Sequence, residues 1–403
     1  MKYDRYPTAE EAAAEYILPD PLRKEDSSRV TTPAEWMLFQ REKILSLFKE
    51  YEYGQILPRP DSMRFELLTR KEDALNGKAI RKEVRIHCGM RNGKSIAFDL
   101  LLYVPKHKTG PVPAFLGLNF GGNHVTTLEK DVRKTGFKEP GIPAMEERGC
   151  QASRWDFETV IRRGYASATI SYHDILPDRV NSWDESVFRL FFEKEQYPSI
   201  GKTYSVIGAW AWGLSRGLDY LQSDTDIAFD RVAVHGHSRL GKTSLWAGAI
   251  DRRFKMVISN NSGCGGGALH KRKIGENLSL HFKYHTEKCG VPCWFVDKLE
   301  QFIWHEELLP IDQHELMALI APRPLAIATA TEDYDADPKG EFLACKAASE
   351  VYALFGSKGL EADVMPAPDV NISGDISFHL RTGKHNQTPQ DWAHYLDLAD
   401  RYL

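Results

Sequence analysis

One short stretch of the sequence, VAVHGHSRLGKTSLW (232–246), has the residue types that nucleophilic chemistry needs. A β-branched run ends at Gly236, Ser238 follows, and apolar residues at helical spacing begin almost at once. A serine hydroxyl is a weak nucleophile and requires a neighbouring base. A tight strand-to-helix turn, which Gly236 and Gly241 would give room, lifts the hydroxyl above a sheet and aims helix N–H groups at a forming oxyanion. The alternative is a serine that caps an ordinary helix.

An acid and a histidine follow this serine in the chain order that α/β-hydrolases use. Asp333 comes directly after the apolar run PLAIATAT, with Glu332 as a substitute, and His385 lies in RTGKHNQ before the last helical pattern. An acid at a strand end can hold the imidazole tautomer and stabilise the imidazolium. A helix-capping Asp333 and a solvated His385 are the alternatives. We therefore predict a triad of Ser238, His385 and Asp333.

The motif LNFGGNH contains a pair of glycines, Gly121 and Gly122, at the end of a predicted buried strand. This is where α/β-hydrolases place the second oxyanion donor, a backbone N–H in a glycine-rich loop. A plain glycine turn is the alternative. We predict that these two glycines form the oxyanion loop.

The elements that would position these groups alternate along the second half of the chain. Strand patterns separated by helical patterns predict a mainly parallel sheet covered by helices on both faces. Three earlier strands, separated by Gly and Asn turns, are expected to pair antiparallel at one edge. The predicted fold class is therefore α/β, in one domain over 1–403. It carries an N-terminal helical and antiparallel edge segment (about 1–105) and cap-like insertions at about 127–156 and 264–316.

Individual residues in these elements also have structural interpretations. The stretch 33–52 has the apolar spacing of an amphipathic helix. Trp210 and Trp212, on the helix before the serine strand, are expected to be packing residues.

Composition and charge exclude several classes of function. The 403 residues are 42% hydrophobic and 11% aromatic, which supports a large core. A net charge of −4 gives no sign of a nucleic-acid partner or a basic membrane-binding face. The first residues lack the apolar region of a secretory signal, so we expect a cytoplasmic protein, or a secreted or periplasmic one if a leader was trimmed. Oligomeric state is left open.

Metal-ligating residue types do not form a recognisable site. Cys289 and Cys293 are four residues apart, but no second pair has zinc-site spacing. His281 and His285 have helical spacing without the acid of an H-E-x-x-H motif, so a polar role in the cap is favoured. We expect no metal and no cofactor.

A longer set of motifs resembles a known family. LNFGGNH, WAWGLSRGLDYL, VHGHSRLGKTSLWAGAIDRRF, ISNNSGCGGGAL, LPIDQHELMALIAPRPL and HLRTGKH occur in the family's order over about 110–403. They are similar to glucuronoyl esterases of plant-biomass degradation, particularly the bacterial branch often labelled acetyl xylan esterase. The resemblance implies an α/β-hydrolase fold and a metal-free serine esterase acting on carbohydrate esters.

The resemblance also implies roles for individual residues. Ser238 would be the nucleophile and His385 the general base, while Arg239 would help to stabilise the oxyanion. Lys242, one helical turn after Ser238, would bind sugar hydroxyls of the uronate. A surface ion pair or a snorkelling side chain is the alternative for both basic residues. Among other candidates for substrate contact we include Gln313 and His314, from LPIDQHEL.

Three departures from the family pattern bear on the substrate. Asn261 stands where fungal members carry the catalytic glutamate, so the acid role rests on Asp333, which matches an aspartate of some bacterial members. Asp335 replaces a tryptophan that lines the uronate site, which makes this substrate-binding position polar and anionic. Val291 stands where fungal enzymes place a sugar-binding glutamate.

The sequence thus predicts a serine carbohydrate esterase that hydrolyses an ester of a uronic acid in plant-type polysaccharide, with a methyl-esterified uronate as a rival substrate. Its partner would be a uronic-acid-containing polysaccharide or oligosaccharide. The first alternative is an acetyl xylan esterase, for which the carbonyl belongs to acetate. The second is a non-catalytic carbohydrate-binding relative.

Overall fold

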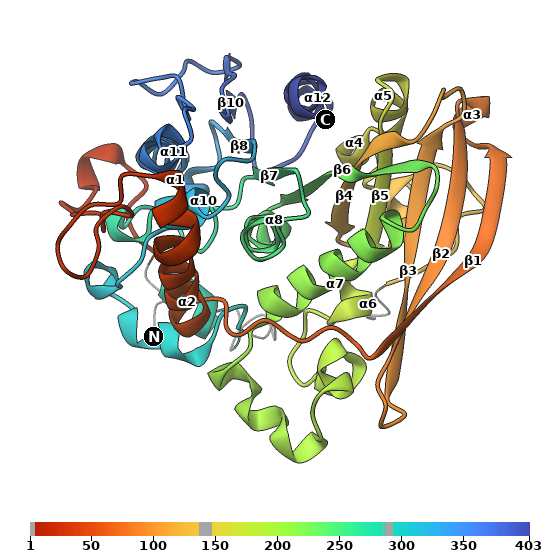
Figure 1. Ribbon diagram of the computed structural model, residues 1–403, viewed down its shortest axis with the longest axis horizontal. Helices are drawn as coiled ribbons and strands as arrows, with labels where there is room; N and C mark the ends of the chain where they lie inside the picture. The colour runs from red at the N-terminus through yellow and green to blue at the C-terminus, as the bar shows by residue number, and fades with distance from the viewer. Residues whose placement is uncertain (1–4, 137–146, 285, 287–292) are drawn as a thin grey trace.

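A computed structural model describes residues 5–136, 147–284, 286 and 293–403 (Figure 1). In this part of the chain, ten strands form one mixed sheet in the order β1-β2-β3-β5-β4-β6-β7-β8-β10-β9. β4 to β8, together with β10, pair in parallel, while β1, β2 and β3 add an antiparallel edge and β9 closes the other edge. The strands are β1 Ser62–Asp73, β2 Ala79–Gly89, β3 Ser95–Pro105, β4 Val112–Asn119, β5 Ala166–Ser171, β6 Ile227–His237, β7 Met256–Asn260, β8 Leu325–Ala330, β9 Asn371–Ile372 and β10 Ile376–Arg381.

Helices cover both faces of this sheet (Figure 1). α7, α8, α10 and α11 pack on one face with α2, and α12 packs on the other face beside α5. The helices are α1 Pro33–Glu35, α2 Arg41–Tyr51, α3 Ala74–Gly77, α4 Ala152–Trp155, α5 Phe157–Arg162, α6 Tyr172–Ile175, α7 Val206–Leu221, α8 Arg239–Ile250, α10 Gln313–Ala318, α11 Pro338–Ala353 and α12 Pro389–Tyr402.

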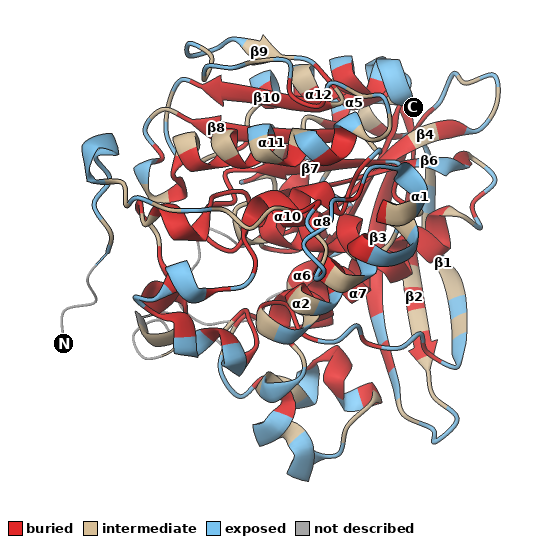
Figure 2. Cartoon of the chain, turned by 60° about the vertical axis from the view of Figure 1, so that its left-hand side comes forward, coloured by how far each residue is buried: buried red, intermediate tan, exposed pale blue. Residues whose placement is uncertain are grey.

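Alternation along the central strands explains this layering. In β4, Phe115 packs into the cluster under α12, whereas Ala114 and Leu116 pack into the larger cluster under α7 and α8. Successive side chains of a strand point to opposite faces, so a strand buried on both faces is apolar throughout. Every residue of α7 is buried, and Figure 2 shows the central strands and α7 as buried while β1 is partly exposed.

The predicted architecture is therefore confirmed in its main features. The antiparallel edge, the parallel centre and the first helical segment all form, although Trp36–Gln40 winds as a π-helix between α1 and α2. Sequence patterns missed β9 and the 3₁₀ helices η5 Trp183–Glu185, η6 Val187–Leu190 and η7 Lys194–Lys202. Among the described residues, no helix is both long and apolar enough to cross a bilayer.

Candidate active site

Ser238 occupies the sharp turn that its sequence context predicts. β6 ends at His237, α8 begins at Arg239, and the serine between them has φ 59° and ψ −131°. Holding a serine in this sparsely populated region costs about 1–3 kcal/mol. The Ser238 N–H donates to the Asn260 carbonyl at 2.8 Å, which ties the turn to the neighbouring strand β7, and the side chain stays partly accessible.

Gly236 is what makes this turn sterically feasible. A Cβ at position 236 would lie 1.9 Å from the carbonyl oxygen of Leu240. No heavy-atom contact of that length is tolerated, so the first turn of α8 can approach β6 only over a glycine.

His385 and Asp333 lie within hydrogen-bond distance of each other at the edge of the sheet where Ser238 lies. The Asp333 Oδ2 atom lies 2.7 Å from His385 Nδ1. Asp333 follows β8 and His385 follows β10, and these two strands are parallel neighbours. The aspartate side chain is 8% exposed and the histidine side chain 44% exposed. A carboxylate only accepts, so Nδ1 carries the proton of this bond and Nε2 is left as the basic nitrogen.

His237 packs against the imidazole of His385 next to the serine. The rings of His237 and His385 lie 4.6 Å apart between centroids, and His237 directly precedes Ser238. Among the described residues, no hydrogen bond joins Ser238 Oγ to His385. Catalytic hydrogen bonds are often long before substrate binds and tighten in the complex.

Asn261 supports the acid from the next strand. Its Nδ2 donates to Asp333 Oδ2 at 2.6 Å, so this oxygen receives two hydrogen bonds. Asn261 has φ 48°, a left-handed conformation that asparagine adopts more easily than most residues. An amide carries no negative charge, so Asn261 is not itself the acid, but its hydrogen bond holds the carboxylate of Asp333 in place.

A second carboxyl group, that of Glu341, lies buried beneath this loop. Burial raises the pKa of Glu341 to about 8, although N–H groups of Ser262 and Gly263 donate to its Oε1 at 3.0 Å. Near neutral pH Glu341 is thus mainly protonated, and Asp333 has no second negative charge beside it.

Arg239 is oriented by two residues that sequence patterns did not indicate, Asp178 and Trp294. Its guanidinium donates to Asp178 Oδ2 and lies 4.6 Å from the centre of the Trp294 ring. Trp294 Nε1 donates to Asp178 Oδ1 at 3.0 Å, so the aspartate fixes both groups. The Arg239 side chain is 29% exposed and lies directly beside the serine in the chain. No motif links Asp178 or Trp294 to Ser238, so neither residue could be predicted from its sequence context.

The Lys242 side chain is buried and points into the protein, whereas the predicted sugar contact requires it to face a substrate. Its ammonium donates to the carbonyl oxygens of Ser262 at 2.7 Å and Cys264 at 2.6 Å and to Glu276 at 3.0 Å. An ammonium has three N–H bonds, so all of them are engaged. Direct sugar binding by Lys242 would require one of these partners to be released.

Half of the predicted oxyanion loop needs correction. The Gly122 N–H donates to Asn119 Oδ1 at 2.8 Å, so it is not available to an oxyanion. Gly122 has φ 105°, and a Cβ there would lie 2.0 Å from the Thr135 carbonyl oxygen, so this glycine is required by the turn itself. Gly121 stays the candidate donor.

Gln313 and His314 do not face a substrate, which corrects the prediction for both. Gln313 is fully buried and donates to the Glu52 carboxylate at 2.9 Å. His314 is 1% exposed and contacts the Pro19 carbonyl oxygen at 2.8 Å through Nε2. A capping box between Asp312 and Glu315 starts α10 here and turns both side chains into the core.

The remaining predicted positions lie as follows. The Asp335 side chain is 44% exposed and forms an ion pair with Arg5. Trp210 and Trp212 are buried, and their indole N–H groups donate to backbone carbonyls, which confirms a packing role.

The candidate metal-binding residues are placed only in part. Cys289, His285 and Val291 lie outside the described residues. His281 is buried 3.6 Å from Glu276 and packs against the rings of Trp294 and Phe295. Within the described ranges, no group of three or more His, Cys, Asp or Glu side chains is arranged to hold a metal ion.

Comparison with known proteins agrees with this arrangement. Residues 157–356 match the family model "Glucuronyl esterase, fungi". Carbohydrate esterase MZ0003, from an unknown prokaryotic organism, is 44% identical over 96% of this chain and 90% of its own length.

Solved structures give the same result over the whole fold. A promiscuous esterase of carbohydrate esterase family 15, from a marine bacterial metagenome, is 40% identical with a TM-score of 0.88, and the match covers 99% of this chain and all of that one. A glucuronoyl esterase from Solibacter usitatus is 36% identical with a TM-score of 0.86, over 97% of this chain and 99% of that one. This chain therefore belongs to the glucuronoyl esterase family, carbohydrate esterases with the α/β-hydrolase fold.

Proposed function

We propose that this protein hydrolyses the ester of a uronic acid carried by a carbohydrate, with Ser238, His385 and Asp333 as its catalytic triad. The single observation that carries the proposal is the 2.7 Å contact between His385 and Asp333 at the sheet edge where Ser238 sits on a strained turn. Family membership supports the substrate class, because a relative that is 36% identical is a glucuronoyl esterase.

The proposed reaction starts with attack of Ser238 Oγ on the ester carbonyl while His385 Nε2 takes the hydroxyl proton. Asp333 stabilises the imidazolium that forms. The negative oxygen of the tetrahedral intermediate is met by the free N–H groups at the start of α8 and by the guanidinium of Arg239. His385 then gives its proton to the leaving alcohol, and water releases the uronic acid from Ser238.

Arg239 also accounts for a preference for uronate esters. A guanidinium one residue past the nucleophile lies beside the carbonyl under attack, and it suits the carboxylate product. Asp178 and Trp294 hold this group in place, so the charge is preorganised and not supplied by a mobile side chain.

A broader ester specificity is the second candidate. The engaged ammonium of Lys242 leaves fewer groups to recognise a uronate, and a 40% identical relative is described as promiscuous. Acetyl esters would then be cleaved as well, with the carbonyl belonging to acetate.

A substrate panel separates these candidates. Benzyl glucuronate, methyl glucuronate, methyl galacturonate and 4-nitrophenyl acetate are compared by kcat/KM with the native protein. We expect the glucuronate esters to be preferred and Ser238→Ala to abolish their hydrolysis, whereas Ser199→Ala, at an exposed serine of η7, is the matched control and keeps full activity. A preference for the acetyl ester favours the second candidate, and activity that survives Ser238→Ala refutes the mechanism.

A further inference from the structure

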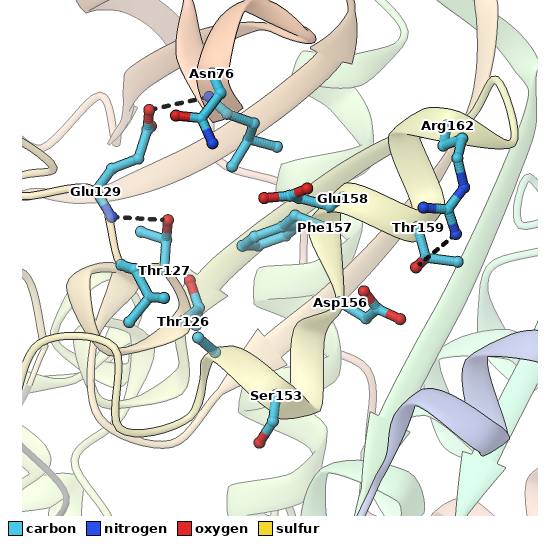
Figure 3. A pocket seen from close by; sticks show the side chains of 13 residues that line it. Asn76, Thr126, Thr127, Glu129, Ser153, Asp156, Phe157, Glu158, Thr159 and Arg162 are labelled. Atoms are coloured by element: carbon cyan, nitrogen blue, oxygen red, sulfur yellow. Dashed lines mark hydrogen bonds between the residues drawn. The ribbon is translucent and has the colours of Figure 1, made fainter.

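A cavity of about 650 Å³ lies apart from the triad, between the turn α3, the segment 126–129 and the helices α4 and α5 (Figure 3). None of its lining residues belongs to the triad. The two sites nevertheless share helix α4. Ser153 lines the cavity, while its neighbour Arg154 donates from Nε to Asn386 Oδ1 at 2.8 Å, directly beside His385.

Two of the acidic groups in this cavity are already neutralised by the protein. Glu129 accepts from the Leu75 N–H at 3.1 Å and from Arg81 at 2.7 Å (Figure 3 draws the first bond). Glu158 pairs with Lys78 at 2.5 Å. Their carboxylates therefore shape the wall and offer little unpaired charge to a ligand.

Three polar side chains are left for a ligand. Among the described residues, no hydrogen bond is made by the side chains of Asn76, Ser153 or Asp156, all of which line the cavity. Asp156 is the N-cap residue of α5, a position where aspartate usually binds the helix N–H groups, yet it makes no such bond. It has φ 37°, a conformation that costs about 1–2 kcal/mol.

The charge balance of the lining argues against an ionic ligand. An anion would face three carboxylates and one guanidinium, that of Arg162, which already donates to Thr159 at 3.1 Å. A metal ion would find a single unpaired carboxylate. The lining instead suits a ligand that has both hydroxyl groups and C–H faces. Such a ligand could bond to the carboxylate of Asp156, the amide of Asn76 and the hydroxyl of Ser153, and its C–H faces could pack on the exposed Leu128.

We propose that this cavity binds neutral sugar residues of the polysaccharide whose uronate ester is cleaved at Ser238. The proposal rests on the proposed function for the identity of the polymer. A polymer that is held at the cavity and reaches past α4 would place its ester-bearing branch at the triad, so the second site raises affinity through effective concentration. A small ester cannot span both sites and gains nothing from it.

Two variants test the cavity directly. Ser153→Trp fills it, and Asp156→Asn removes the free charge with a residue that also tolerates a left-handed backbone. Ser199→Trp, on the remote helix η7, is the control for an added indole. Thermal unfolding establishes that each variant is folded, and Asp156→Asn carries the test if Ser153→Trp does not fold.

The readout compares a polymeric substrate, glucuronoxylan bearing uronate esters, with benzyl glucuronate. Loss of two hydrogen bonds is worth about tenfold in affinity. We therefore expect KM for the polymer to rise about tenfold in Ser153→Trp and severalfold in Asp156→Asn, with kcat and the kinetics of benzyl glucuronate unchanged. An unchanged KM for the polymer overturns the proposal, as does an equal loss on both substrates.

Binding without turnover separates this proposal from the proposed function. Xylohexaose carries no ester, and its binding to the native protein is measured by calorimetry. Binding that Ser153→Trp abolishes supports the cavity even if no uronate ester is hydrolysed, whereas binding unaffected by Ser153→Trp refutes it even if the esterase activity is present.

Discussion

Replacing Asp333 by asparagine removes the negative charge beside His385 with almost no change of shape. The Asp333 side chain is 8% exposed, and its Oδ2 atom lies 2.7 Å from the Nδ1 atom of the imidazole. In the transition state this imidazole carries a positive charge, and an asparagine amide that donates to Nδ1 also holds the ring in the wrong tautomer.

The size of the effect follows from the geometry. Two unit charges about 4 Å apart interact by about 4 kcal/mol at an effective dielectric constant of about 20. Since each 1.36 kcal/mol changes a rate about tenfold, Asp333→Asn should lower kcat by about 10³. KM should change little, because Asp333 contacts His385 and Asn261 and not the substrate.

The assay is steady-state hydrolysis of benzyl glucuronate, with Glu332→Gln as the matched control. Glu332 is exposed and precedes Asp333 in the chain. Its backbone N–H donates to the Gly383 carbonyl, near His385, and Glu332→Gln leaves this backbone bond in place. We expect Glu332→Gln to stay within about threefold of the native kcat, since exposed substitutions change little. A loss of less than tenfold in Asp333→Asn, or an equal loss in both variants, would refute the assignment of Asp333 as the acid.

Three further outcomes are expected. Burial raises the pKa of Glu341 to about 8, so protonated Glu341 stabilises the fold fully below about pH 4.5, and this stabilisation is lost as the pH rises to 8. Over that range the free energy of unfolding should fall by up to about 1.4 kcal/mol per pH unit in the native protein, and Glu341→Gln should lack this pH dependence. Denaturant unfolding at several pH values checks this, and an unaltered pH dependence in Glu341→Gln would contradict it. Asp178→Ala leaves Arg239 without its buried partner, so the free energy of unfolding, measured by chemical denaturation, should fall by about 3 kcal/mol. Steady-state kinetics should show a lower kcat, and a variant as stable and active as the native protein would contradict this. Gly236→Ala should cost about 3 kcal/mol in thermal unfolding, because its Cβ would meet the Leu240 carbonyl, whereas Gly110→Ala, where nothing lies within 4 Å, should be near neutral; equal stability of both would refute the steric argument.

The parts of the fold that sequence patterns predicted are those with strong periodicity. The buried half of β6 and the strands β7 and β8 are short runs dominated by apolar and small residues, and Ser238 and Asp333 follow the ends of β6 and β8 at the same sheet edge. Parallel strands bring their carboxyl ends together, so Ser238 and Asp333 could be placed near one another from order alone. The 3₁₀ helices between 183 and 202 have no such period and were missed.

Side-chain direction was the part of the site that sequence could not supply. Lys242 shares a helix face with Ser238, yet its ammonium turns to the carbonyl oxygens of Ser262 and Cys264. Gln313 and His314 lie in a motif with family character but are buried by the capping of α10. Asp178 and Trp294 meet Arg239 from distant loops, and only three-dimensional packing brings them together.

The bond from Asn261 to Asp333 has a consequence for how enzymes of this kind are recognised. A sequence search that requires an acidic residue after β7 would reject this chain, because Asn261 stands there. An acidic residue, Asp333, nevertheless bonds to His385 from the end of the neighbouring strand β8. The ends of two adjacent parallel strands lie equally near the imidazole, so a carboxylate at either position can bond to it. The residue at the other position can then hold that carboxylate by a hydrogen bond, as Asn261 does here. Annotation of distant homologues is then better based on distances between atoms than on letters in a column.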